Sequence, residues 1–318
     1  MPRFCPFTGR KVLLFWGLLG AILQTYGQAR VVGLPIQWSQ YGQQIPQINP
    51  AYTAKDARFA LGVGNMSHLG PWSNNGNYYG QLETQLGGNG KSDKQFHALG
   101  SYLTGDKEGA FLSRTRGYLT YAYNLELREE LRLAAGLSFG FANILVSSNA
   151  FNAGGVANAP DANLGVCLYN KGFHLGISSN QLLNSQLKPI GEVTVLQRHW
   201  NIIGSKTFVL SPNFKLEPFV LARVVPNQLS SFDIGTSGVL GNAIRLTVNY
   251  QQLQSVACIV GLDKVSFGGS ELKAAFSYKF PLSSNHLGNI QTIEITLGYL
   301  WFGKRNKEQE NQITEEDE

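Results

Sequence analysis

The sequence predicts an all-β protein, a transmembrane antiparallel β-barrel of about 14 strands with a short N-terminal periplasmic segment and a polar C-terminal tail. Three observations predict this fold: an N-terminal export signal, a long series of segments in which apolar and polar residues alternate, and a composition rich in turn formers. The chain has 318 residues, with 36 glycines, 11% aromatic residues and 15% charged residues. This balance is typical of a β protein with many turns and excludes a disordered chain.

Residues 1–27 have the pattern of a signal peptide. Three basic residues, Arg3, Arg10 and Lys11, precede an apolar run of 12 residues that begins at Val12. The run is too short to span a bilayer, so we expect cleavage before Gln28 and export of the chain to the cell outer membrane. Without those three bases, 23 of the 26 Lys and Arg residues remain against 21 acidic residues, a net charge of +2. No basic stripe is left, which excludes nucleic acid as a partner.

Residues 28–57 do not alternate, and the stretch 40–52 is rich in Gln and Pro. Asn49 suits a helix N-cap and Pro50 the first helical position, so a short helix is expected from Pro50 to Ala57. We place this segment at the periplasmic mouth of the barrel, with its Gln-rich part tucked under or into the lumen as a plug. Direct binding of a partner protein is the alternative role.

From residue 58 to residue 302 the period of apolar residues is two, which is the pattern of strands with one apolar face. The segment from Leu131 to Phe141 is an example, with Leu, Ala and Phe alternating with Arg, Ala, Gly and Ser. Several such segments exceed the roughly 9–11 residues that a tilted strand needs to cross a bilayer, and in lipid the sheet must close. One of them places Lys206 on its apolar face. The expected strands are residues 57–66, 77–87, 95–105, 111–126, 131–146, 161–170, 172–180, 197–210, 213–225, 228–237, 242–252, 255–263, 270–281 and 290–302.

The connections between these strands agree with an even strand number. Odd-numbered connections such as Ser67–Gly76, Ser147–Pro160 and Gln181–Leu196 are long, whereas Asn170–Lys171 and Ser211–Pro212 are tight. Barrels have short periplasmic turns and longer outer loops, so both ends of the barrel are expected in the periplasm. The long loops are either ordinary mobile loops or a contact surface for a secreted partner.

The last strand and the tail differ sharply in composition. Tyr299, Trp301 and Phe302 suit a membrane–water boundary. Residues 303–318 follow with three bases and six acids, a net charge of −3. We expect this acidic tail in the periplasm, as a solvated segment or a docking arm.

Two cysteines remain in the mature chain, and strand parity predicts that they stay free. Cys167 alternates with the apolar residues Leu164, Val166 and Leu168, whereas Cys258 lies in the apolar register itself. Thiols on opposite faces of one closed sheet cannot form a disulfide.

The polar faces carry charges of both signs, which either fill the lumen by pairing across it or line a selective pore. The candidate lumen polar network is Arg132, Glu217, Arg223, Arg245, Glu271 and Glu294, accompanied by Lys215, Lys273 and Lys279.

Evidence for an enzyme is thin, and no catalytic, cofactor-binding or metal residue is assigned. The five histidines lack metal-ligand spacing, and no phosphate loop or nucleophile elbow occurs. His68 followed by the stretch 73–76 (SNNG) is faintly similar to a grouping of outer-membrane phospholipases, but its spacing is wrong.

Motifs that begin with Gln40-Tyr41 and Asn49-Pro50-Ala51-Tyr52 and end with Gly298-Tyr299 resemble, in their order, those of the PorP/SprF family of type IX secretion outer-membrane proteins. Gln40-Tyr41 followed by Ile48 and Asn49-Pro50-Ala51-Tyr52 resembles the N-terminal signature of the family. Asp106 and Gly109 resemble its Asp-x-x-Gly loop. Further resemblances lie at residues 118–124, 161–166, 176–183 and 298–299. The chain departs from the family at residues 65–68, where an Arg-x-Gln-Trp cluster is frequent, and at Thr53-Ala54, where Ala-Gly is usual.

The resemblance implies a non-enzymatic outer-membrane component of the type IX secretion or gliding machinery of Bacteroidota. Such a component aids secretion or cell-surface attachment of cargo proteins through protein–protein binding. The implied partners are other secretion-system subunits in the periplasm and outer membrane, secreted or surface adhesin-type cargo, and the lipid bilayer. Periodicity by itself supports equally an outer-membrane transport channel for small or hydrophobic solutes, which remains the alternative.

Overall fold

A computed structural model gives the structure of this chain. It describes residues 35, 37–70, 73–87, 94–128, 130–148, 153–190, 193–226, 230–241, 243–252, 255–267, 269–282 and 291–303. The expected signal peptide and the acidic tail after Gly303 therefore lie outside the described residues. Within the described part, no helix has the length and the apolar character that a membrane crossing requires.

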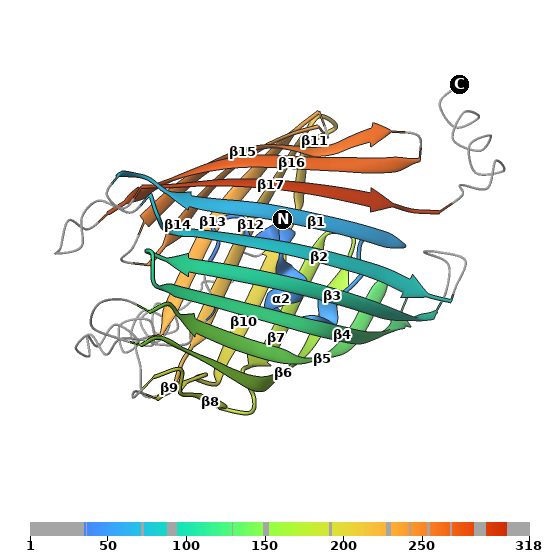
Figure 1. Cartoon of the computed structure of the whole chain (residues 1–318). Coiled ribbons are helices and arrows are strands. Elements are labelled where there is room, and N and C mark those ends of the chain that lie inside the picture. The colour runs from blue at the N-terminus through green and yellow to red at the C-terminus, as the bar shows by residue number, and fades with distance from the viewer. Residues whose placement is uncertain are drawn as a thin grey trace, which may run out of the picture.

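The described strands build one closed antiparallel sheet (Figure 1). Strands that follow one another in the chain are neighbours in the sheet, and pairing of β1 with β17 and of β10 with β12 closes it. The strands of the barrel are β1 (Phe59–His68), β2 (Gly76–Leu86), β3 (Gln95–Glu108), β4 (Leu112–Arg128), β5 (Leu131–Val146), β6 (Gly155–Asn170), β7 (Phe173–Asn180), β10 (His199–Lys206), β11 (Phe208–Ser211), β12 (Phe214–Val224), β13 (Ser231–Leu240), β14 (Ile244–Gln251), β15 (Ser255–Phe267), β16 (Ser270–Pro281) and β17 (Thr292–Trp301).

The barrel has the 14 strands that the sequence predicts, because β10 and β11 are two parts of one strand and both pair with β12. The interruption is at Thr207, directly after the residue that the alternation placed on the apolar face. Lys206 does point outward, and its Nζ lies 5.1 Å from the centroid of the Phe208 ring. The predicted transmembrane antiparallel barrel is confirmed.

Strand β6 begins at Gly155, whereas the sequence predicted a loop up to Pro160. Its first residues continue the alternation, with Val156 and Asn158 exposed and Ala159 buried. They pair with β5 in an unbroken register, which extends from Gly155 opposite Val146 to Tyr169 opposite Arg132. The alternation of apolar and polar residues is hard to recognise here, because small residues occupy both faces and because Pro160 argues against a strand. The proline is tolerated since β7 reaches only to Leu164, which leaves this part of β6 without a strand on that side.

The two ends of the barrel differ in their connections. The long-loop end carries five long connections, at residues 69–75, 147–154, 181–198, 225–230 and 282–291, and two three-residue connections, at residues 109–111 and 252–254. The short-turn end carries two-residue turns at residues 129–130, 171–172, 212–213 and 268–269, a three-residue turn at residues 241–243 and one longer connection at residues 87–94. The loop 181–198 contains a small hairpin of β8 (Gln186–Leu187) and β9 (Thr194–Val195).

The outer face of the barrel is apolar and the lumen face is small or polar. Along β5, Leu137 and Phe139 are 50% and 62% exposed, whereas Ala134 and Ser138 between and beside them are buried. An outward apolar band of this kind faces lipid in a transmembrane barrel. The two cysteines follow the same rule, because Cys167 is buried and Cys258 exposed, and both thiols are free as predicted.

The lumen holds the chain that precedes β1. This part forms a 3-10 turn η1 (Tyr41–Gln43), a short helix α2 (Ile45–Ile48) and a second 3-10 turn η2 (Pro50–Tyr52). Figure 1 shows α2 between the strands of the near wall and those of the far wall. The helix predicted from Pro50 to Ala57 is therefore wrong beyond its first turn. It ends because Thr53 is extended, with ψ 126°, and Ala54 has a positive φ of 51°. Helix α2 was not predicted.

Candidate functional site

The residues in the lumen, 37–57, are called the lumen segment below, and they run the length of the barrel. At the long-loop end, Arg223 Nη1 donates to the carbonyl of Pro35, two positions before the first residue of the segment, over 3.3 Å. Near the short-turn end, Gln85 Nε2 donates to the carbonyl of Ala54 over 2.8 Å. The sequence placed the segment at one mouth of the barrel, with its Gln-rich part tucked under or into the lumen. The segment lies in the lumen and extends from one end of the barrel to the other, because polar side chains along the way hold it.

The upstream half of the lumen segment, residues 37–44, is bound around one buried carboxylate. Ser39 N donates to both oxygens of Glu294, over 2.9 and 3.0 Å, and Gln40 N donates over 3.2 Å. The Thr296 hydroxyl donates to Gln40 Oε1 over 2.6 Å, and Lys279 Nζ lies 3.5 Å from Glu294. Glu294 is 0% exposed, so its charge is balanced by backbone N–H groups and one ammonium group.

Tyr41 separates two cavities. Its ring packs on Ile203 and Leu221 and meets Phe219 edge-on, with centroids 5.4 Å apart. On the short-turn side lies a cavity of about 1020 Å³, called the vestibule below, and on the long-loop side lies a chamber of about 60 Å³. Tyr41 lines both cavities. The lumen segment therefore lies between the two cavities at this residue.

The downstream half of the lumen segment, residues 45–57, is fixed to the opposite wall by Asn49. The Asn49 amide donates to the carbonyls of Val166 on β6 and Ile177 on β7, over 3.1 and 3.2 Å. Its side-chain oxygen accepts from Ala51 N over 3.0 Å, which caps η2 as the sequence predicted. One amide thus bridges two strands and starts a turn.

Four glycines on the lumen face of one side of the barrel, called the glycine track below, make room for this half. A Cβ atom at Gly136 would lie 2.4 Å from the Pro50 carbonyl carbon, and one at Gly165 would lie 2.0 Å from Asn49 Oδ1. Only a residue without a side chain allows such an approach of backbone to wall. The track consists of Gly100 on β3, Gly136 on β5, Gly165 on β6 and Gly176 on β7.

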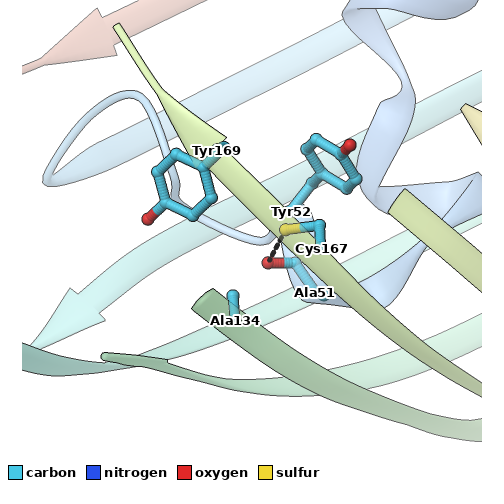
Figure 2. Packing of buried hydrophobic residues seen from close by; sticks show 5 residues of the cluster. All are labelled: Ala51, Tyr52, Ala134, Cys167 and Tyr169. Carbon is cyan, nitrogen blue, oxygen red and sulfur yellow. Dashed lines mark hydrogen bonds between the residues drawn. The ribbon is translucent and has the colours of Figure 1, made fainter. Parts of the chain in front are cut away.

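A small apolar cluster completes the downstream contact (Figure 2). Ala51 and Tyr52 pack on Ala134, Cys167 and Tyr169, and all five are buried. Figure 2 shows the Cys167 thiol directed at the Ala51 carbonyl, with a separation of 3.7 Å. The motif residues Asn49 to Tyr52 are therefore the best-packed part of the lumen segment.

The charged residues expected to form one lumen network lie in separate groups. Arg245 pairs with Glu217 and Asp263 over 2.7 and 2.8 Å, and Arg132 pairs with Glu126 over 3.2 Å. Arg132, Glu217, Arg245 and Glu271 all line the vestibule, whereas Arg223 and Glu294 hold the lumen segment. The sequence missed Asp263 and Glu126, because their pairing depends on strand register.

The Asp-x-x-Gly motif stabilises the turn between β3 and β4. Asp106 pairs with Arg114 over 2.8 Å, and Gly109 has a φ of +64° that favours glycine. Gly109 N donates to Asn75 Oδ1 over 2.6 Å, and His68 Nδ1 lies 3.4 Å from the Thr292 hydroxyl. The residues that resemble a lipase grouping thus have structural partners. No group of three His, Cys, Asp or Glu side chains in the described part of the chain could hold a metal ion.

The solved structures that this chain resembles include outer-membrane barrels. The CymD monoaromatic hydrocarbon channel is 11% identical over 86% of this chain and 98% of its own, with a TM-score of 0.54. The toluene transporter TodX of Pseudomonas putida is 13% identical over 87% of this chain and 97% of its own, with a TM-score of 0.49. At such identities the likeness to CymD shows the fold alone. Comparison with curated proteins finds no match.

The family comparison covers most of the chain. The model of the family described as type IX secretion system membrane protein PorP/SprF matches residues 33–299. The match begins just before the lumen segment, includes the Asn49 to Tyr52 motif and the glycine track, and ends in the last strand. The chain therefore belongs to the PorP/SprF family of type IX secretion system membrane proteins.

Proposed function

We propose that this protein is a non-enzymatic outer-membrane component of the type IX secretion or gliding machinery, which aids secretion or cell-surface attachment of cargo by binding other proteins. The family match supports the secretion system. In this proposal the short-turn end faces the periplasm and the long-loop end faces the outside, since barrels of this class have short periplasmic turns. Other secretion-system subunits would then bind at the short-turn end and adhesin-type cargo at the long-loop end.

The occupied lumen is the observation that carries this proposal. The lumen segment is bound to both sides of the barrel, by Glu294 on one side and the glycine track on the other, with Tyr41 between. A barrel with an occupied lumen offers its rims and loops as working surfaces. Binding, and not conduction, is therefore the function that the geometry supports best.

The loop 181–198 supports a contact surface at the long-loop end. Leu187 and Leu196 are each 1% exposed and pack on Ala142, Ile144 and Ala159 of β5 and β6. Such an apolar anchor holds the loop in one conformation, which lowers the entropy cost of binding a partner. Two further apolar residues of the loop, Leu183 and Val193, are about half exposed above this anchor.

Deletion of the gene tests the proposal. We expect fewer cargo proteins at the cell surface or in the medium, measured by mass spectrometry, and recovery with the wild-type gene. A Leu183→Asp/Val193→Asp variant should restore the barrel but not cargo attachment, whereas the control Leu210→Asp, exposed at the short-turn end, should restore both. Unchanged surface and secreted proteins after deletion would contradict the proposal.

The vestibule favours a second candidate, a transport channel for small or hydrophobic solutes. Its volume of about 1020 Å³ is large enough to hold a solute. Purified protein in planar bilayers separates the two functions. We expect no steady current from the wild type, and steady conductance or solute flux would favour the channel.

A further inference from the structure

The vestibule has the form of a binding pocket that opens at the short-turn end. Its walls include the turn at residues 170–172 and Phe302, which directly follows the last strand. Its inner end is closed by Tyr41, Gly42 and Ile45 of the lumen segment. The volume of about 1020 Å³ is at the upper limit of pockets that take small ligands, and it suits a stretch of peptide.

Most charges of the vestibule are matched within the barrel, but one acceptor on β16 is not. Arg245 is paired with Glu217 and Asp263, as described above. The buried Oε2 atom of Glu271 has no hydrogen-bond partner among the described residues. Lys273, two positions further along the same face of β16, lines the vestibule and interacts electrostatically with the buried Glu83 carboxyl group. A buried acceptor atom thus faces the vestibule without a partner beside a half-buried cation, and an unsatisfied acceptor is costly unless a ligand supplies a donor.

The C-terminal tail leaves the barrel beside these two residues. Strand β17 pairs with β16 so that Glu271 lies opposite Leu300 and Lys273 opposite Gly298. Glu271 is thus nearer the mouth of the vestibule and Lys273 deeper inside. The tail that follows carries basic residues first, at positions 304, 305 and 307, and acidic residues next, at positions 308 and 310.

We propose that the vestibule binds the protein's own C-terminal tail, residues 304–318. Lys304 and Arg305 face Glu271 at the mouth, and Glu308 or Glu310 reaches Lys273 inside. Fifteen residues extend to at most roughly 50 Å, which exceeds the distance that this path needs. Tethering at the mouth gives the tail an effective concentration on the order of millimolar, so weak contacts are sufficient. The tail then occupies the surface that a periplasmic ligand would need.

Cysteine cross-linking in the full chain tests the proposal. In a Cys258→Ala background folded in lipid nanodiscs, Ala275→Cys in the vestibule wall is combined with Asn311→Cys in the tail. Oxidation should cross-link this pair at least about tenfold faster than the matched control, in which Phe276→Cys faces lipid on the same strand. Equal rates, or no cross-link at Ala275→Cys, would overturn the proposal.

Charge reversal tests the chemistry of recognition. Glu271→Lys should lower the cross-linking rate about fivefold, as expected for one partly buried ion pair. Adding Lys304→Glu and Arg305→Glu should restore the rate, which a merely misfolded variant could not do. Failure to restore it would overturn the proposal.

Removal of the tail tests which ligand occupies the vestibule. In a chain truncated after Gly303, Ala275→Cys should react several-fold faster with a water-soluble maleimide, and a synthetic peptide of residues 304–318 should slow it again. An unchanged reactivity would overturn the proposal in favour of a solute or a partner peptide. None of these measurements depends on secretion.

Discussion

The two halves of the lumen segment are held in the barrel by different physical means. The upstream half lies on polar atoms that reach across the lumen, above all the Glu294 carboxylate, with Asn249 Nδ2 donating to the carbonyl of Ser39 over 3.2 Å. The downstream half touches the wall directly, because the glycine track lets its backbone approach. The first contact depends on charge and hydrogen bonding, and the second on shape. Different substitutions should therefore release each half.

The largest effect is expected from filling the glycine track. In Gly136→Ala the added carbon would lie 2.4 Å from the Pro50 backbone, which is not a flexible group and must move. We expect a loss of about 3 kcal/mol in the free energy of unfolding, measured by urea denaturation in lipid vesicles. The control is Gly80→Ala on β2, where no atom lies within 4 Å of the new carbon. Equal stability of the two variants would show that shape does not hold the downstream half.

The next largest effect is expected at the upstream half. Glu294→Gln keeps the size of the side chain but removes its charge. It also replaces one acceptor oxygen with an NH2 group, which would face backbone N–H donors. Two backbone N–H groups then lose a charged acceptor, which costs about 2 kcal/mol in the free energy of unfolding. The control Glu130→Gln affects an exposed pair with Lys171 and should cost about 0–0.5 kcal/mol. A Glu294→Gln protein as stable as this control would contradict the role of the carboxylate.

A third variant weakens the downstream half without changing its shape. Asn49→Asp keeps the acceptor that caps η2 but loses the amide that donates to Val166 and Ile177. We expect a loss of about 1–2 kcal/mol in the free energy of unfolding, together with faster cleavage of the lumen segment by added protease. Asn49→Ala, which removes the cap as well, should cost more. An Asn49→Asp protein as stable as the wild type, beside a destabilised Asn49→Ala protein, would assign the effect to capping alone.

The barrel could be predicted from the sequence because its two faces meet different solvents. Where outward residues are large and inward ones small, as from Leu131 to Phe141, the alternation marks the strand directly. The alternation did not reveal residues 155–160 of β6, because both faces carry small residues there. These residues belong to the strand only because they pair with β5. The strand interruption at Thr207 was not visible in the sequence either. It lies where the pairing of β10 with β7 ends, with Lys206 opposite Phe173.

The lumen segment was recognised as an exception to the alternation, but its path was not predictable. Composition indicates that Gln40 to Tyr52 is no strand, yet it does not say which wall the segment meets. The inward position of Gly136 and Gly165 was visible in the sequence, whereas the reason for these glycines is a backbone far away in the chain. The pairing of Arg245 with Asp263 also depends on sheet register, since Arg245 of β14 lies opposite Gly261 of β15, two positions from Asp263.

A double-mutant cycle would sharpen the comparison of the two halves. Because their anchors lie on opposite sides of the lumen, Gly136→Ala and Glu294→Gln should lower the free energy of unfolding additively, within about 0.5 kcal/mol. A larger coupling energy would mean that both halves leave the lumen as one unit. A Gly80→Ala/Glu294→Gln cycle is the matched control.

The smallest effect on stability is expected at Tyr41, in the upstream half. Its hydroxyl has no hydrogen-bond partner among the described residues, so Tyr41→Phe should change the free energy of unfolding by less than about 0.5 kcal/mol. The ring is what separates the vestibule from the outer chamber, so Tyr41→Ala should instead produce measurable current in planar bilayers while Tyr41→Phe stays silent. Current from Tyr41→Phe would assign the barrier to the hydroxyl. Absence of current from Tyr41→Ala would assign the barrier to the rest of the lumen segment. Shape in the downstream half and hydrogen bonding in the upstream half would then block the lumen without the ring.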